Sequence, residues 1–316
     1  MISVFRCTII WAFALMIVIS PHSEATPIAF DVTGAYHSIS ARAAALWQAR
    51  HRMTSSAFQD TFGKLVRDKY RLTYVSGYTI DDDPRFAAIW DQNVSSDWAA
   101  RHGMTSEEYQ GQFDALVGNG FRLRLVNGYT VAGDARYAAI WDKSTGAAWV
   151  ARHGLTSSEY QSAFDTFFAR GYRLKHVSGY SQGNQASYAA LWEKSTTNST
   201  WVAHHGMTSS DYQGLFDKYV GQGFRLLHVN GYVVNNVDYY AAIWDKSPSS
   251  PWVARHRMSS TDYQNEFDKW VGEGYRLTLI CMLLFGSKSS EALVSFEVLK
   301  AQCWLQRGEL EAYMVR

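Results

Sequence analysis

Cysteine is scarce in this sequence, which has three residues of that type, Cys7, Cys281 and Cys303, in 316. The first lies in the N-terminal apolar segment and the other two lie near the C-terminal end. This distribution argues against a disulfide-stapled scaffold and offers no paired-cysteine spacing for zinc. The chain must therefore be held together by a hydrophobic core.

Strong charge and long apolar runs are also missing. The 30 Lys and Arg balance 29 Asp and Glu, and no basic block occurs, which argues against a nucleic-acid partner. The apolar segment Cys7 to Ile19 is too short to cross a bilayer as a helix. It follows Arg6 and precedes the small-x-small site Ser23-Glu24-Ala25, so residues 1–25 are predicted to be a signal peptide. We expect a secreted, extracellular protein with no membrane association after cleavage; a signal anchor is the alternative.

Phosphate-binding and metallohydrolase motifs are absent as well. The sequence has no G-x-x-x-x-G-K-[ST], no G-x-G-x-x-G and no H-E-x-x-H. Its 47% hydrophobic and 15% aromatic content is nevertheless that of a globular protein rather than a disordered one. No cofactor and no metal are therefore predicted.

Repetition is what the sequence has in abundance. A histidine that ends an Arg-His or His-His pair recurs every 51 or 52 residues, and two tryptophans recur in step with it. The histidines are His51, His102, His153, His205 and His256, and the tryptophans are Trp47, Trp98, Trp149, Trp201 and Trp252 in one series and Trp90, Trp141, Trp192 and Trp244 in the other. A fixed period of this size indicates a repeat architecture. We predict a tandem-repeat domain over residues 47–280, preceded by a degenerate half-repeat over residues 26–46.

Each repeat predicts one helix followed by two strands. A capping box opens the helix and a glycine ends it in four copies: the boxes are Thr105/Glu108, Thr156/Glu159, Thr208/Asp211 and Ser259/Asp262, and the glycines are Gly120, Gly171, Gly223 and Gly274. The first copy has Ala57 at the box position and Lys69 in place of the glycine. Its helix should be the weakest at both ends.

The strand patterns are [YF]-R-L-x-x-V-[NS]-G-Y-x-V and [YF]-A-A-[IL]-W-[DE], with turn residues between them that differ in every copy. They predict an antiparallel hairpin with a longer loop, and the glycine indicates a bulge or a close backbone approach. Stacked units then predict an α+β repeat fold, in which the hairpins join into one curved antiparallel sheet backed by helices on one side. The paired alanines are expected to leave room for a helix close to the sheet.

The repeat pattern fails after Ile280, where another V-[NS]-G-Y should stand. Residues 281–316 therefore form an aberrant C-terminal tail. The break falls inside a strand, which is an unusual place for a domain boundary and favours a truncated or mis-joined reading frame. A true capping helix is the alternative.

Residues repeated in one register are more simply scaffold than active site. The Arg-His pairs precede a helix N-terminus and could bind anions there, but a hydrogen bond between neighbouring units is the favoured interpretation. A repeated salt bridge is predicted between arginines of the strands and aspartates of the helices: Arg71, Arg122, Arg173, Arg225 and Arg276 with Asp114, Asp165, Asp217 and Asp268.

Three further features are candidates for function. Residues 179–183 match the nucleophile elbow G-x-S-x-G, but the motif falls in a hairpin turn rather than a strand-to-helix turn, so Ser181 is not expected to be catalytic. His176 and His228 share a register with Tyr and Leu, which favours a half-buried wall over a zinc site. No catalytic residue is predicted. Sequons at Asn93 and Asn198 predict glycosylation in an exposed loop.

The full repeat signature, R-H-G-[ML]-T-S…Y-Q…F-D…G-[YF]-R-L…V-[NS]-G-Y…[YF]-A-A-[IL]-W-[DE]-K, resembles a tandem-repeat domain first named from bacterial proteins. That domain also forms the N-terminal half of the fungal polyglycine hydrolases. The resemblance implies secreted serine-type peptidases that cut glycine-rich linkers of plant chitinases. It places catalysis in a separate β-lactamase-related domain with an S-x-x-K motif. This sequence contains no S-x-x-K, so peptidase activity is not expected of the chain as it stands.

These observations predict a secreted, non-catalytic repeat module that recognises a protein partner through its variable turns and the concave face of its sheet. By the resemblance, it is the N-terminal portion of a polyglycine hydrolase-like protein, and its partner is a secreted protein such as a glycine-rich chitinase linker. Two alternatives stay open. One is a stand-alone carbohydrate- or cell-wall-binding module, and the other is a hydrolase with an unrecognised site.

Overall fold

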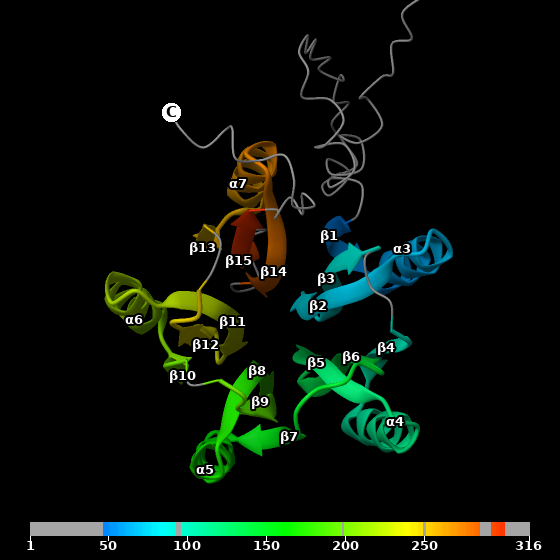
Figure 1. The fold of residues 1–316 in the computed structure, drawn as a ribbon. Coiled ribbons are helices and arrows are strands. Elements are labelled where there is room, and N and C mark those ends of the chain that lie inside the picture. Colours follow the sequence, from blue (N-terminus) through cyan, green and yellow to red (C-terminus); the bar gives the residue numbers. More distant parts are fainter. Residues whose placement is uncertain (1–46, 93–95, 198, 249–250, 285–291, 301–316) are drawn as a thin grey trace, which may run out of the picture.

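The structure is a computed structural model that describes residues 47–92, 96–197, 199–248, 251–284 and 292–300. The described chain forms five consecutive units, each with a strand, a helix and two further strands (Figure 1). The units are β1 (Trp47–Thr54), α3 (Ser55–Arg67), β2 (Arg71–Ile80) and β3 (Asp83–Asp91); β4 (Trp98–Met104), α4 (Ser106–Gly118), β5 (Arg122–Val131) and β6 (Asp134–Asp142); β7 (Trp149–Thr156), α5 (Ser157–Ala169), β8 (Tyr172–Gln182) and β9 (Gln185–Lys194); β10 (Trp201–Met207), α6 (Ser209–Gly221), β11 (Arg225–Val234) and β12 (Val237–Asp245); and β13 (Trp252–Met258), α7 (Ser260–Gly272), β14 (Tyr275–Leu284) and β15 (Ala292–Lys300).

Each unit folds into its own three-stranded antiparallel sheet, with the last strand in the centre. In the first unit the order is β1-β3-β2. The helix and hairpin predicted for each repeat are confirmed. The strand that begins at the first tryptophan was missed, although its residues pair with the central strand from Trp47↔Asp91 to Arg50↔Ala88.

The five sheets are arranged around a common axis, with the helices at the perimeter and β2, β5, β8, β11 and β14 nearest the centre (Figure 1). The ring closes, because β14 lies beside β2 and Arg276 pairs with Asp91 of the first unit. The expected single curved sheet is therefore wrong: hydrogen-bonded ladders stop at the edge of each unit, and the contact to the next unit is made mainly by side chains. This is the arrangement of a β-propeller, with three-stranded blades.

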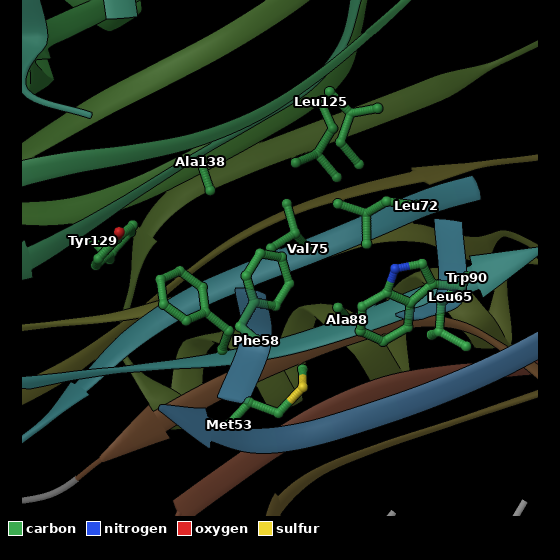
Figure 2. Close-up of a cluster of buried hydrophobic side chains, with 12 residues drawn as sticks. Met53, Phe58, Leu65, Leu72, Val75, Ala88, Trp90, Leu125, Tyr129 and Ala138 are labelled. Atoms are coloured by element: carbon green, nitrogen blue, oxygen red, sulfur yellow. The ribbon is translucent and has the colours of Figure 1, made fainter. Parts of the chain in front are cut away.

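Hydrophobic clusters fill the interfaces between successive sheets. The cluster between the first and second units joins Phe58, Val75 and Trp90 to Leu125 and Ala138 (Figure 2). A corresponding cluster joins the last unit to the first. The paired alanines point to opposite faces, so Ala87 belongs to one interface and Ala88 to the next. They let neighbouring sheets approach each other, and the same clusters include helix residues, such as Phe58 and Leu65 of α3 in the cluster of Ala88.

The hairpin turns are shorter than predicted. In the first four units the two strands of the hairpin pair to their last residues, as in Ile80↔Asp83 and Val131↔Asp134, so that two residues remain in the loop. Both loop residues of the first hairpin have positive φ, 48° at Asp81 and 60° at Asp82. This geometry is a type I′ turn, whose twist matches that of the flanking strands.

The tail contributes to the fifth unit. Residues 292–300 form β15, which pairs with β13 and β14 as the central strand of that sheet. Leu299 takes the register position of Asp142 in the second unit, and Cys281 takes the position of the [NS] residue of V-[NS]-G-Y. The predicted signal peptide over residues 1–25, the half-repeat over residues 26–46 and the end of the tail lie outside the described residues. The reading-frame interpretation stays a prediction.

The helix ends follow the sequence closely. Capping boxes open α4, α5, α6 and α7, and the predicted C-terminal glycines have φ between 75° and 81°. In α3, Thr54 accepts a hydrogen bond from the Ala57 backbone, while Ala57 has no side chain to return one. Lys69 occupies the glycine position at φ 66°.

Replacing Lys69 with glycine should stabilise the protein by about 0.5–1 kcal/mol, because lysine is strained in the left-handed region and glycine is not. Lys69→Ala is the matched control, since it removes the same side chain and keeps the strained backbone. Urea unfolding of the three proteins gives the comparison. Equal midpoints for the glycine and alanine variants would contradict the prediction.

Candidate functional site

The arginine at or next to the start of each inner strand forms an ion pair. Arg71 Nη2 lies 2.5 Å from Asp142 Oδ2, and Arg173 Nη2 lies 2.5 Å from Asp245 Oδ2. In both cases the carboxylate belongs to the central strand of the next unit. The pairs Arg122–Glu193 and Arg276–Asp91 repeat the arrangement.

The predicted pairing with helix aspartates is wrong. The helix aspartates Asp114, Asp165, Asp217 and Asp268 accept hydrogen bonds from glutamines one turn earlier, at 2.7–2.9 Å. The glutamine of the Y-Q pair lies on the same helix face four residues before the aspartate. Each helix aspartate is therefore bound by a glutamine of its own helix. The strand arginine binds the acid of the [IL]-W-[DE] motif instead.

The histidines of the Arg-His pairs lie between units, as favoured above. His153 Nε2 is 3.0 Å from Ser106 Oγ of the preceding unit, and its ring packs edge-on against Tyr109 and Tyr137. His102 in the same way contacts Gln59 at 3.1 Å. The neighbouring arginine folds back, since Arg152 Nη1 donates to the Ala151 carbonyl at 2.8 Å.

A ring of polar side chains surrounds the axis halfway along the inner strands. Each side chain accepts a hydrogen bond from the glycine N–H of the preceding unit: Gly77 N to Asn127 Oδ1 at 2.6 Å, Gly128 N to Ser178 Oγ at 3.0 Å, Gly179 N to Asn230 Oδ1 at 2.7 Å and Gly231 N to Cys281 Sγ at 3.0 Å. Ser76 completes the ring by a hydrogen bond to Cys281, and burial raises the pKa of that thiol to about 11. Cys281 thus replaces Ser or Asn structurally.

Ser181 has no catalytic setting. It lies near the end of β8, and its hydroxyl donates to the Gly183 carbonyl at 2.7 Å. No helix follows it directly, because β9 begins at Gln185. The G-x-S-x-G match is therefore a hairpin turn, as its context indicated.

A cavity lies on the ring axis, near the first residues of the inner strands. It has a volume of about 320 Å³ and is lined by residues of all five inner strands. The lining residues are Thr73, Tyr74, Arg124, Leu125, Lys175, His176, Arg225, Leu227, His228, Thr278 and Leu279. This axial cavity could not be found in the sequence, because its walls come together only when the ring closes.

Each inner strand has a β-bulge at this cavity. The pairing register shifts between Leu72 and Tyr74 in β2 and between Leu123 and Leu125 in β5, and the other inner strands repeat the shift. Two successive residues of a bulged strand can then line one surface. Bulges are common beside binding sites for this reason.

His176 and His228 lie in the cavity wall with ring centroids 4.3 Å apart. His176 Nε2 is 2.9 Å from the Val126 carbonyl and His228 Nε2 is 2.7 Å from the Val177 carbonyl. Burial lowers the pKa of His228 to about 4. Burial also holds the pKa of His176 well below its usual value, and the neighbouring imidazole adds to this effect. Both rings are therefore neutral at pH 7, and a neutral ring that donates through Nε2 keeps its lone pair on Nδ1.

Protein stability should fall as pH drops from about 6.5 to about 4. Burial lowers the pKa of His51 and His228 to about 4, whereas an unfolded histidine titrates near 6.5. Because the unfolded chain binds more protons in this window, acid favours unfolding, by roughly 2–3 kcal/mol for each of the two at pH 4. Urea unfolding at a series of pH values measures the slope.

His228→Gln is the control for that experiment, because glutamine keeps a donor for the Val177 carbonyl and does not titrate. Its stability should depend less on pH than that of the unmodified protein. A free energy of unfolding that stays constant between pH 6.5 and 4.5 would show that protonation costs nothing in these sites.

The variable hairpin turns gather at the other end of the inner strands. Their tips are exposed and are joined in succession: Ala132 N donates to Asp82 Oδ1 at 3.2 Å, Gly183 N to Gly133 O at 3.1 Å, and Asn235 Nδ2 to Asn184 O at 3.2 Å. The pairs Asp81-Asp82, Ala132-Gly133, Gly183-Asn184 and Asn235-Asn236 make one surface, called here the turn face. It carries carboxylates and amides but no cation at these positions.

Asn93 and Asn198, the predicted glycosylation sites, lie outside the described residues. Within the described part of the chain, no helix is long and apolar enough to span a membrane. In that same part, no three His, Cys, Asp or Glu side chains are grouped as a metal ion would require.

The repeats match a known protein family. The family described as "Polyglycine hydrolase-like, structural repeat" matches residues 44–93, 95–144, 146–195, 198–247 and 249–286. The first four segments coincide with the first four units of the ring, and the fifth covers the last unit up to β14; together they cover more than half of the chain. The chain therefore belongs to the polyglycine hydrolase-like structural repeat family.

Proposed function

We propose that this chain is a secreted, non-catalytic binding module that recognises a protein partner through the turn face. One observation carries the proposal. The residues repeated from unit to unit are used in contacts within the ring, whereas the exposed hairpin turns differ in every copy and form a continuous surface. Repeat proteins commonly bind partners in this way, with a constant frame and variable exposed positions.

The chemistry of the turn face suits a polypeptide better than a sugar. Its exposed groups are backbone amides and the side chains of residues such as Asp81, Asp82, Asn184 and Asn235. Such groups can pair with the backbone of an extended, glycine-rich segment, which presents no side chains of its own. A glycine-rich linker of a secreted chitinase is the proposed partner, by the family resemblance. Secretion is proposed from the N-terminal apolar segment and its small-x-small site.

A binding assay with a turn-face variant tests the proposal. Replacing each of the four turn pairs with Asn-Gly removes the differences between turns, and it suits the type I′ geometry of the first, second and fourth turns, in which both loop residues have positive φ. The unmodified protein should bind a chitinase that carries the glycine-rich linker, and the variant should lose that binding. Lys64→Gln/Arg67→Gln, on the exposed perimeter of α3, is the control and should bind normally.

Three outcomes would overturn the proposal. Retention on chitin or glucan without binding to the linker would favour a carbohydrate-binding module. Normal binding by the turn-face variant would place recognition elsewhere on the ring. Cleavage of the linker by protein free of host protease would reveal a hydrolase.

A further inference from the structure

The axial cavity breaks the symmetry of the ring. Most of its lining comes from two positions of the R-L-x-x-V motif that differ among the units, and Arg225 adds the repeated arginine of that motif in the fourth unit. The first position holds Thr73, Arg124, Lys175, Leu227 and Thr278, and the second holds Tyr74, Leu125, His176, His228 and Leu279. A role in the scaffold would favour the same residue in every unit. Residues that differ among the units at these two positions, while the surrounding motif repeats, are the pattern of a binding site.

Positive charge collects at the cavity. Arg124, Lys175 and Arg225 line it, and no carboxylate is among the described residues that do. The nearest carboxylate to each cation is 3.5–3.7 Å away: Arg124 Nε to Asp142, Lys175 Nζ to Glu193 and Arg225 Nε to Asp245. These distances exceed those of a charge-assisted hydrogen bond.

Those carboxylates already have closer partners. Asp142 lies 2.5 Å from Arg71, Asp245 lies 2.5 Å from Arg173, and Glu193 pairs with Arg122. Each acid is therefore shared between two cations. The fifth unit cannot supply another, because Leu299 stands at the register position of the acid. The result is an excess of cations around one end of the axis.

The floor of the cavity is suited to a ligand with more than a bare charge. Tyr74, Leu125 and Leu279 supply apolar surface, and the two neutral histidines keep their Nδ1 lone pairs as acceptors. The volume of about 320 Å³ is large enough for a small organic molecule. The cavity is thus cationic at its rim and largely uncharged at its base.

We propose that the axial cavity binds a small polyvalent oxyanion, a polycarboxylate or a phosphate compound, through Arg124, Lys175 and Arg225. Two or more acid groups on one ligand could engage cations from different units at once. This site lies at the opposite end of the inner strands from the turn face. It therefore does not depend on the proposed recognition of a protein partner.

Calorimetric titration of the full chain with citrate, inorganic phosphate and uncharged glycerol tests the proposal. Citrate or phosphate should bind and glycerol should not, and the affinity should fall as salt is added. Citrate binding alone would identify the carboxylate class, and phosphate binding alone would identify the phosphate class. Arg124→Gln/Lys175→Gln should weaken binding roughly 10- to 100-fold, as expected for the loss of charged partners.

The control is again Lys64→Gln/Arg67→Gln, which removes the same net charge at the ring perimeter and should bind the anion as the unmodified protein does. Histidine ring resonances of His176 and His228 should shift on titration, which locates the ligand without a variant. The proposal is overturned if neither anion binds at millimolar concentration, if both double variants bind equally, or if binding leaves these resonances unchanged.

Discussion

Gly77→Ala is expected to lower the free energy of unfolding by about 3 kcal/mol, although it adds a single methyl group. The glycine of V-[NS]-G-Y lies against the tyrosine of the next unit, and a Cβ on Gly77 would lie 2.5 Å from Tyr129 Cδ1 and 2.7 Å from Cε1. Tyr129 cannot easily withdraw, since it is buried and its hydroxyl accepts a hydrogen bond from Gly103 N at 3.1 Å. The added methyl group must therefore separate two sheets. Urea unfolding measures the loss.

Gly111→Ala is the matched control, because Gly111 lies in the exposed middle of α4 and a Cβ added there would have no neighbour within 4 Å. There alanine should stabilise by about 0.5–1 kcal/mol through helix propensity. The double variant Gly77→Ala/Tyr129→Leu should be less damaged than the sum of its single changes, since the smaller side chain relieves the overlap. Equal effects at Gly77 and Gly111 would show that the two sheets do not meet at this glycine.

That glycine also shows how far the sequence alone can lead. The V-[NS]-G-Y motif predicted a close backbone approach, and the approach is found, but the sequence did not say that the neighbour is Tyr129 of the next unit. Local features such as the Thr105 capping box and the Gly120 helix end were predictable because their partners lie within a few residues. Contacts within one repeat can be predicted from the residues of that repeat. Contacts between repeats depend on how the units are placed in space.

The first strand of each unit was missed for a local reason. In the second unit, β4 is seven residues long and ends at a bend where Gly103 has φ 71°. Its register with the central strand shifts between Arg101 and Met104. A short strand with an irregular end has too little alternation to be distinguished from the approach to a helix. The Trp-x-Ala-Arg pattern could have indicated this strand. The predicted hairpin left one edge of the A-A-[IL]-W-[DE] strand unpaired, and a further strand was needed there.

Ring closure and the axial cavity were beyond the sequence for a different reason. The Arg276–Asp91 pair joins residues separated by 185 positions, and a repeat pattern reads the same in an open array and in a closed ring. Closure depends on the small rotation between successive units, which no single motif encodes. The cationic cavity residues Arg124 and Lys175 were unremarkable in sequence because they occupy a variable position, whereas His176 and His228 could be interpreted as a wall but not assigned to a cavity. Only the closed ring brings them to one place.

Asp142→Ala is expected to cost about 3–5 kcal/mol of stability, because it leaves a buried arginine without its carboxylate. The side chains of Arg71 and Asp142 are 8% and 5% exposed, and the pair joins the first unit to the second. Burial alone would raise the pKa of Asp142, but hydrogen bonds from Ser144 and Arg71 outweigh it and lower the pKa. The carboxylate is therefore charged at neutral pH. Its contribution to stability is lost as the pH falls below the pKa of an ordinary aspartate.

Asp134→Ala provides the comparison within the same unit, since Asp134 is 76% exposed and lies 3.9 Å from Arg136. That change should cost less than about 1 kcal/mol, as for other surface pairs. The decisive variant is Arg71→Met/Asp142→Leu, which removes both charges and should recover most of the loss. The fifth unit already lacks the acid, because Leu299 occupies its register position. The arginine of the preceding unit, Arg225, instead lies 3.5 Å from Asp245 of its own unit. A double variant as unstable as Asp142→Ala alone would mean that the ion pair itself, rather than the relief of an unpaired charge, holds these two units together.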